Sequence, residues 1–280
     1  MTGAEAPRTE PEAPTTYVVD GGVATITLNR PERRNALSPE LVNSLGDHLS
    51  EAAADPGCRV VVLTNAGPAF CAGADLKSGG LPAGEEAWSL EAVLAAILDH
   101  EKPVIGRIAG HCMGGGVGLA AACDLSIASS EARFGFTEVR VGVVPAVISV
   151  VCLPKLRVAD ALELFLTGER IEARRAAEVG LISRAVPPDA LDEAISAVIE
   201  ALLEAAPGAL TTAKRLVYDV PRLGRDEAFS AMARLSAERF SSEEAREGMA
   251  AFRERRRPAW SPGAASSGEA GSIGPGGPGH

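Results

Sequence analysis

The stretch GHCMGGGVGL at residues 110–119 decides the fold of this 280-residue chain. It follows a β-branched run, VIGRI at residues 104–108, and its three consecutive glycines open into a segment of helix-compatible composition. A second stretch of the same kind, FCAGADL at residues 70–76, follows the apolar run VVVLT at residues 60–64. Each stretch is therefore predicted to be a tight turn between a buried strand and a helix.

Two such turns can form an oxyanion hole. A backbone N–H in the first turn of a helix has no intrahelical acceptor, and small residues let a carbonyl oxygen approach it closely. Two of these N–H groups aimed at one point would hold the negative charge of a thioester enolate. Either stretch alone reads equally well as an ordinary turn in a chain with 30 glycines. The acidic residue that ends FGFTE at residues 134–138 favours a catalytic site.

Strand and helix patterns alternate through the first part of the chain, which predicts an α/β fold with right-handed parallel crossovers. Ser38 and Pro39 mark a helix start, because Ser is a good N-cap and Pro suits the first helical turn. From about residue 159 onward the pattern is almost entirely helical, including long helical periodicity over residues 225–252. Strands are predicted at residues 17–19 and 23–28, which form a hairpin, and at residues 60–64, 104–108 and 125–128; helices are predicted around residues 90–97 and from residue 115.

Composition narrows the class of protein. The net charge of −10 argues against a nucleic-acid-binding protein, because phosphate contacts need clustered Lys and Arg. No run approaches the roughly 20 apolar residues of a membrane span, and the N-terminus lacks the apolar segment of a signal peptide. The five cysteines are scattered and have no metal-ligand spacing, so we expect no metal site and a reducing, cytoplasmic location. Residues 1–14 and 261–280 are predicted to be disordered tails.

The chain resembles the enoyl-CoA hydratase/isomerase (crotonase) superfamily from about Tyr17 to Trp260. The resemblance rests on a series of motifs in order: LNRP at residues 28–31, AGADLK at residues 72–77, GGG at residues 114–116 with CDL at residues 123–125, FGFTE at residues 134–138, and LTG at residues 166–168. It implies a ββα spiral core over residues 15–200 and a helical trimerisation region over residues 201–260. It also implies an acyl-CoA thioester as substrate, no separate cofactor, and a homotrimer or a dimer of trimers.

The resemblance also implies roles for individual residues. Backbone N–H groups of Ala72 and Gly115 would form the oxyanion hole, and Glu138 would be the acid/base. The apolar neighbours of Glu138 are expected to raise its pKa, which suits a general acid. Asp75 is expected to have a structural role. Residues matched to substrate or coenzyme A binding are Arg30, Arg33, Ala72, Gly73, Ala74, Asp75, Leu76, Gly114, Gly115 and Gly118.

Gly118 is a departure from the family pattern. Hydratases with two catalytic glutamates carry the second one at this position, where a glycine would open space for a branched acyl group or for another residue. A hydratase using Glu138 alone and a double-bond isomerase both remain open, as does a non-catalytic acyl-CoA-binding subunit. The stretch at residues 138–149 is most similar to bacterial hydratases of methylglutaconyl-CoA type, which favours the hydratase.

Overall fold

The structure is a computed structural model that describes residues 13–75 and 88–263. The two tails predicted to be disordered lie outside these residues, apart from residues 13, 14 and 261–263. The chain divides into two compact units, Met1–Ile199 and Glu200–His280.

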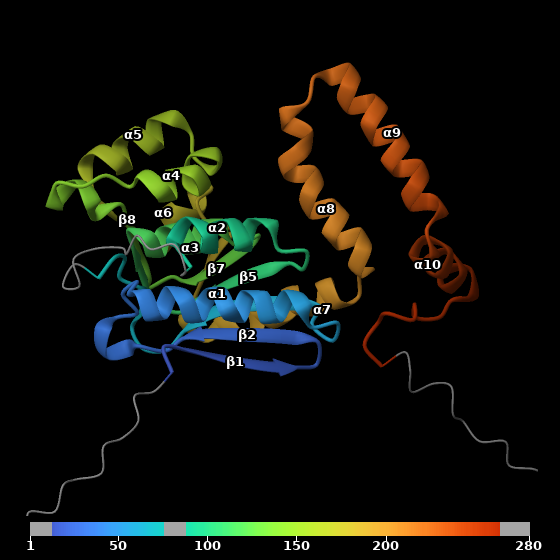
Figure 1. Ribbon diagram of the computed structural model, residues 1–280, viewed down its shortest axis with the longest axis horizontal. Coiled ribbons are helices and arrows are strands. Elements are labelled where there is room, and N and C mark those ends of the chain that lie inside the picture. Colours follow the sequence, from blue (N-terminus) through green and yellow to red (C-terminus); the bar gives the residue numbers. More distant parts are fainter. Residues whose placement is uncertain (1–12, 76–87, 264–280) are drawn as a thin grey trace, which may run out of the picture. The chain divides into compact units, whose positions relative to one another are not determined.

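A six-stranded sheet forms the centre of the first unit (Figure 1). β1 pairs with β2 in antiparallel fashion, and every other neighbouring pair is parallel. The hairpin and the parallel crossovers predicted from the sequence are therefore confirmed. The strands, in their order across the sheet, are β1 (Thr15–Asp20), β2 (Val23–Leu28), β3 (Val60–Asn65), β5 (Val104–Ile108), β7 (Leu125–Ser129) and β10 (Arg184–Val186).

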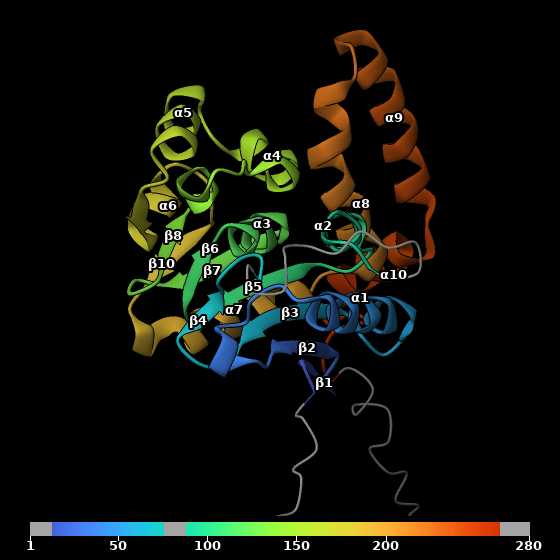
Figure 2. The same cartoon turned by 60° about the vertical axis from the view of Figure 1, so that its left-hand side comes forward.

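Three helices, α1 (Pro39–Ala54), α2 (Leu90–Asp99) and α3 (Gly115–Ala122), lie side by side over one face of this sheet (Figure 2). The Ser38 side chain accepts a hydrogen bond from the Leu41 N–H at 3.4 Å, so the predicted N-cap of α1 is confirmed. α1 turns Leu41, Leu45 and Leu49 into the core, as its period of 3.6 residues requires.

A second, four-stranded sheet is absent from the sequence prediction. It consists of β4 (Ala69–Cys71), β6 (His111–Met113), β8 (Arg133–Gly135) and β9 (Arg170–Glu172). β4, β6 and β8 are parallel, and β9 runs antiparallel to β8. Each strand has only three residues, which is too short for an alternating pattern to stand out.

Of the remaining helices of the first unit, α6 (Ala173–Glu178) packs against β8 and β9 of the smaller sheet. The prediction of almost uninterrupted helix from residue 159 is wrong at β9 and β10, which join the edges of the two sheets through pairing that no local pattern reveals. The remaining helices of the first unit are η1 (Pro31–Arg33), η3 (Thr137–Val141), α4 (Ala146–Cys152), η4 (Leu153–Lys155), α5 (Val158–Thr167), α6 (Ala173–Glu178), η5 (Pro188–Ala190) and α7 (Leu191–Leu203). The last of them, α7, runs across the boundary into the second unit.

The second unit continues with α8 (Pro207–Asp219), η6 (Val220–Arg222), α9 (Arg225–Ser241) and α10 (Glu243–Glu254). The helical periodicity predicted over residues 225–252 is confirmed, in two helices that meet at Ser242. The Ser242 hydroxyl caps α10 by accepting from the Ala245 N–H at 3.1 Å. Within residues 13–75 and 88–263, no single helix is long and apolar enough to cross a membrane. The bent helix pair Pro188–Leu203 and Pro207–Arg222 reaches that length and apolar composition only when its two members are taken together.

Candidate active site

The smaller sheet brings three distant segments of the chain to one place. Because β4, β6 and β8 are parallel, their carboxyl ends lie at the same edge of the sheet. β4 leads into residues 72–75, β6 leads into the triple glycine, and β8 leads into η3, which carries Glu138. Both glycine-rich turns and the candidate acid therefore meet at this edge.

The two turns touch closely enough that side chains would not fit between them. A Cβ on Gly73 would lie 2.9 Å from the Met113 carbonyl oxygen and 3.5 Å from the Gly115 nitrogen. Gly73 also has a φ of +87°, which a residue with a side chain rarely adopts. A Cβ on Gly116 would lie only 2.3 Å from the Cys71 carbonyl oxygen. Glycine at both positions is thus a condition for bringing the turns together.

Two backbone N–H groups at this contact have no acceptor among the described residues. Gly115 is the first residue of α3, so its N–H has no intrahelical partner and lies at the positive end of the helix. Ala74 forms an isolated parallel bridge with Leu37, but the hydrogen bonds of this bridge are made by the backbone of the residues on either side of Ala74. The Leu37 N–H donates to the Gly73 carbonyl at 2.8 Å, and the Asp75 N–H donates to the Leu37 carbonyl at 3.4 Å. The N–H of Ala74 itself therefore points away from Leu37.

The assignment of Ala72 to the oxyanion hole is wrong. Its N–H donates to the Arg34 carbonyl oxygen at 3.0 Å and is not available to a substrate. The N–H of Ala74, two residues further along the same turn, has no such acceptor in the part of the chain that the structure describes.

Glu138 presents a carboxyl group beside the triple glycine. A Cβ on Gly114 would lie 3.1 Å from Glu138 Oε1, while Glu138 Oε2 is buried and has no hydrogen-bond partner among the described residues. Burial raises the pKa of the Glu138 carboxyl above its usual range, as the sequence predicted. A half-buried carboxyl group that favours its neutral form is suited to donating a proton.

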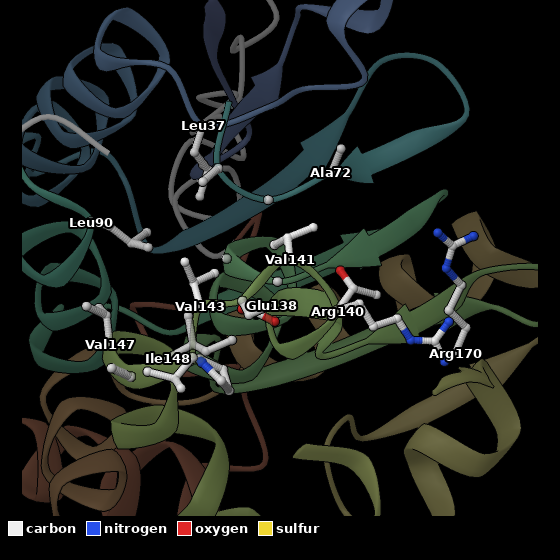
Figure 3. A pocket seen from close by; sticks show the side chains of 18 residues that line it. Leu37, Ala72, Leu90, Glu138, Arg140, Val141, Val143, Val147, Ile148 and Arg170 are labelled. Atoms are coloured by element: carbon white, nitrogen blue, oxygen red, sulfur yellow. The ribbon is translucent and has the colours of Figure 1, made fainter. Parts of the chain in front are cut away.

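These groups line one cavity of about 510 Å³ (Figure 3). Ala72, Gly73, Ala74, Gly114 and Gly115 all line it, together with Glu138. Most of the remaining wall is apolar, and surroundings of low polarity strengthen electrostatic interactions. The larger apolar side chains labelled in Figure 3 are Leu37, Leu90, Val141, Val143, Val147 and Ile148.

Gly118 does not open space in this cavity. It is buried, and a Cβ there would lie 2.3 Å from Ile148 Cγ2. Ile148 comes from α4, which packs against α3, and its side chain fills the volume beside Gly118. Of the two possibilities considered from the sequence, a neighbouring residue that reaches in is correct, and free space for an acyl branch is wrong.

The arginines and acid near the first turn do not line the cavity. Arg30 Nη1 lies 3.5 Å from a Glu40 carboxylate oxygen and donates to Ser38 Oγ at 3.3 Å. Arg33 Nη1 lies 3.6 Å from Asp75 Oδ2, and the Asp75 side chain is buried. Asp75 thus ties η1 to the turn, which agrees with its expected structural role. Leu76 lies outside the described residues, and coenzyme A binding by Arg30 and Arg33 stays a prediction.

Sequence reasoning missed much of the cavity wall, including the side chains of Arg140, Ile148 and Arg170. Arg140 follows Glu138 by two residues and could have been found from its place in the motif. Ile148 and Arg170 belong to α4 and β9, and only the packing of these elements reveals their position. Across residues 13–75 and 88–263, no group of three or more His, Cys, Asp or Glu side chains is placed to hold a metal ion.

Comparisons with known proteins agree with this geometry. The sequence profile of the family described as enoyl-CoA hydratase/isomerase matches residues 19–263. A relative from Thermus thermophilus with the provisional name enoyl-CoA hydratase is 39% identical over 248 residues, which cover 86% of this chain and 98% of the relative.

Solved structures are also similar. The crystal structure of an enoyl-CoA hydratase from Mycobacterium smegmatis has a TM-score of 0.81 at 33% identity and covers 90% of this chain and 99% of its own. An enoyl-CoA hydratase from Mycobacterium avium has a TM-score of 0.67 at 40% identity and covers 90% of this chain and 100% of its own. The crotonase-like α/β fold expected from the sequence is confirmed by these similarities. The chain belongs to the enoyl-CoA hydratase/isomerase family.

Proposed function

We propose that this chain adds water to the double bond of an enoyl-CoA thioester, with Glu138 as its acid/base. The observation that carries the proposal is the meeting of three groups in one cavity: the N–H of Ala74, the N–H of Gly115, and the carboxyl of Glu138, whose Oε2 has no hydrogen-bond partner among the described residues. The N–H groups supply what an enolate oxygen needs, and Glu138 supplies the proton that the α-carbon needs.

The reaction balances with one carboxyl group. Water attacks the β-carbon, and the electrons of the double bond move toward the thioester carbonyl, whose oxygen gains negative charge. Ala74 and Gly115 hold that oxygen with their N–H groups. Glu138 gives its proton to the α-carbon and takes one from the attacking water, so that the carboxyl group returns to its neutral form.

A second candidate reaction is double-bond isomerisation, which is favoured by the packing at Gly118. Glu138 is the one carboxyl-bearing residue among the described residues that line the cavity, and Ile148 fills the volume beside Gly118. A single carboxyl group can remove a proton from one carbon and return it to another. A screen of short enoyl-CoA thioesters by mass spectrometry separates the two reactions, because hydration adds the mass of water and isomerisation leaves the mass unchanged.

The same screen tests the alternative that the chain is a non-catalytic acyl-CoA-binding subunit. Such a protein would bind the thioesters and convert none of them. A carboxyl group with a raised pKa beside two available N–H groups supports an enzyme, because simple binding does not need a proton donor at this place.

We also propose that the chain assembles as a homotrimer or a dimer of trimers. The second unit exposes large apolar side chains: Phe229 is 72% exposed, Phe240 68% and Phe252 86%. Exposed aromatic side chains in this number are typical of surfaces that bind another protein chain. Light scattering at micromolar concentration should give at least three times the chain mass of 28.8 kDa, and a monomer mass would contradict the assembly.

A further inference from the structure

Two arginines, Arg140 and Arg170, stand out in the otherwise mostly apolar wall of the cavity. They come from separate elements, η3 and β9, and are the two basic side chains among its described lining residues. Figure 3 shows them beside one another, at the end of the cavity away from Leu90 and Val147. Neither residue has a role in the reaction proposed above.

Arg140 is fixed in place by a neutral partner. Its Nε and Nη2 each donate to the Thr167 carbonyl oxygen at 3.3 Å, at the end of α5. Its side chain lies across Gly168, where a Cβ would come within 3.1 Å of Nε. Because a carbonyl oxygen carries no full charge, the positive charge of Arg140 is not neutralised by this contact.

The Arg170 side chain has no hydrogen-bond or ion-pair partner among the described residues. It lies opposite Gly135 in the β8–β9 ladder, and a Cβ on Gly135 would come within 3.2 Å of Arg170 Cγ. The stem of Arg170 is therefore held against β8, while its guanidinium group keeps all of its donors for another molecule.

Among the described residues, no ion pair joins a carboxylate to Arg140 or Arg170, and three neighbouring carboxylates are paired with other arginines. On α5, Asp160 and Glu163 pair with Arg175 at 2.8 and 3.7 Å. On β9, Glu172 pairs with Arg133 at 2.9 Å. The pKa of Glu138 is raised by burial, whereas a closely paired arginine would lower it. The cavity thus carries local positive charge in a chain whose net charge is −10.

We infer that Arg140 and Arg170 form a subsite for a carboxylate on the acyl group, so that the preferred thioesters are those of dicarboxylic acids. A guanidinium group matches a carboxylate through two parallel N–H···O bonds, and the free fork of Arg170 can make both. Arg140 adds a second donor group from a fixed position. This inference rests on the proposed function, because it assigns the acyl group that the same cavity accepts.

The test is a binding titration of the full chain with saturated thioesters, which cannot be hydrated. Succinyl-, glutaryl- and adipyl-CoA are compared with 4-methylpentanoyl-, 5-methylhexanoyl- and 6-methylheptanoyl-CoA, respectively. Each pair has nearly the same shape and the same coenzyme A phosphates, and differs in whether a carboxylate or an isopropyl group ends the chain. Three acyl lengths are tested so that at least one of them places its terminal carboxylate beside the arginines.

The expected result is that at least one dicarboxylic thioester binds about tenfold more tightly than its isopropyl counterpart, as charge-assisted hydrogen bonds at a partly exposed site allow. Arg170→Met should abolish that preference, and Arg170→Lys should retain part of it, because lysine keeps the charge but not the planar fork. The control is Arg174→Met, which removes an exposed arginine outside the cavity and should leave the preference intact.

Two results would overturn the inference. One is the absence of any preference for a carboxylate at all three lengths. The other is an equal loss of affinity for both members of a pair in Arg170→Met, which would mean that the arginine binds the coenzyme A phosphates.

Hydration of crotonyl-CoA, measured on the same preparation, tests the proposed function separately. If the enzyme hydrates an enoyl-CoA but shows no preference for a carboxylate, only the carboxylate subsite is refuted. If it shows the preference but converts no enoyl-CoA, only the proposed reaction is refuted.

Discussion

The cavity has two walls of different construction. One wall is backbone: the N–H groups of Ala74 and Gly115, brought together by glycines that allow the turns to touch. The other wall is side chain: Glu138, Arg140 and Ile148 from η3 and α4, and Arg170 from β9. The backbone wall can do one thing, which is to stabilise negative charge on an oxygen. In the proposed reaction the side-chain wall moves the protons, and in the inference above it also selects the acyl group.

The largest effect is expected on the side-chain wall, at Glu138. Glu138→Gln removes the proton donor and should lower kcat by about two to four orders of magnitude, the usual contribution of general acid–base catalysis. The dissociation constant for a saturated acyl-CoA should change little, since the amide keeps the shape of the carboxyl group. Steady-state kinetics and a binding titration measure both quantities. Glu131→Gln, an exposed glutamate before β8, is the control; near-normal turnover in Glu138→Gln would refute its role.

The backbone wall is tested by a pair of variants at Gly115. Gly115→Pro removes the N–H, and proline is tolerated at the first residue of a helix. Gly115→Ala keeps the N–H and brings the same Cβ, which would lie 2.4 Å from the end of the Leu37 side chain. The proline variant should have a kcat about two to three orders of magnitude below that of the alanine variant. Equal kcat values in the proline and alanine variants would show that the Gly115 N–H is not part of the oxyanion hole.

The contact between Gly118 and Ile148 tests the side-chain wall with a smaller effect. Gly118→Glu alone should destabilise the fold by about 1–3 kcal/mol or more, because its Cβ would lie 2.3 Å from Ile148 Cγ2. The double variant Gly118→Glu, Ile148→Ala should recover part of that loss and should hydrate crotonyl-CoA faster than Ile148→Ala alone.

Urea unfolding and hydration assays on all three variants complete this cycle. Additive losses of stability in the double variant would mean that Ile148 does not fill the volume beside Gly118. Hydration no faster than in Ile148→Ala would mean that a second carboxyl group has no use in this cavity.

The smallest effect concerns stability and pH. Because burial raises the pKa of Glu138 in the folded protein, the folded state holds this proton at pH values where the unfolded chain has released it. The free energy of unfolding should therefore fall as pH rises from the ordinary glutamate range through the raised pKa. Glu138→Gln removes this loss, so the variant should gain Tm relative to the wild type across that window. A Tm difference that is constant with pH would contradict a raised pKa.

The difference between the two walls also explains how far the sequence could predict the structure. The glycines, the β-branched runs and the Ser38-Pro39 helix start are local signals, and the larger sheet and its helices follow from them. The smaller sheet could not be predicted, because its three-residue strands are defined only by their pairing. Which N–H of residues 72–74 is available depended on a contact with Arg34, and what lies beside Gly118 depended on α4. In both cases a distant segment determines the outcome.

The most direct test of the proposed reaction is the product that the wild type forms in water labelled with heavy oxygen. A panel of short straight, branched and dicarboxylic enoyl-CoA thioesters is incubated with the enzyme, and the products are analysed by mass spectrometry. We predict a 3-hydroxyacyl-CoA product that carries the label from at least one member of the panel. A product of unchanged mass with a shifted double bond, and no label in any 3-hydroxyacyl-CoA across the panel, would contradict the hydratase and favour the isomerase.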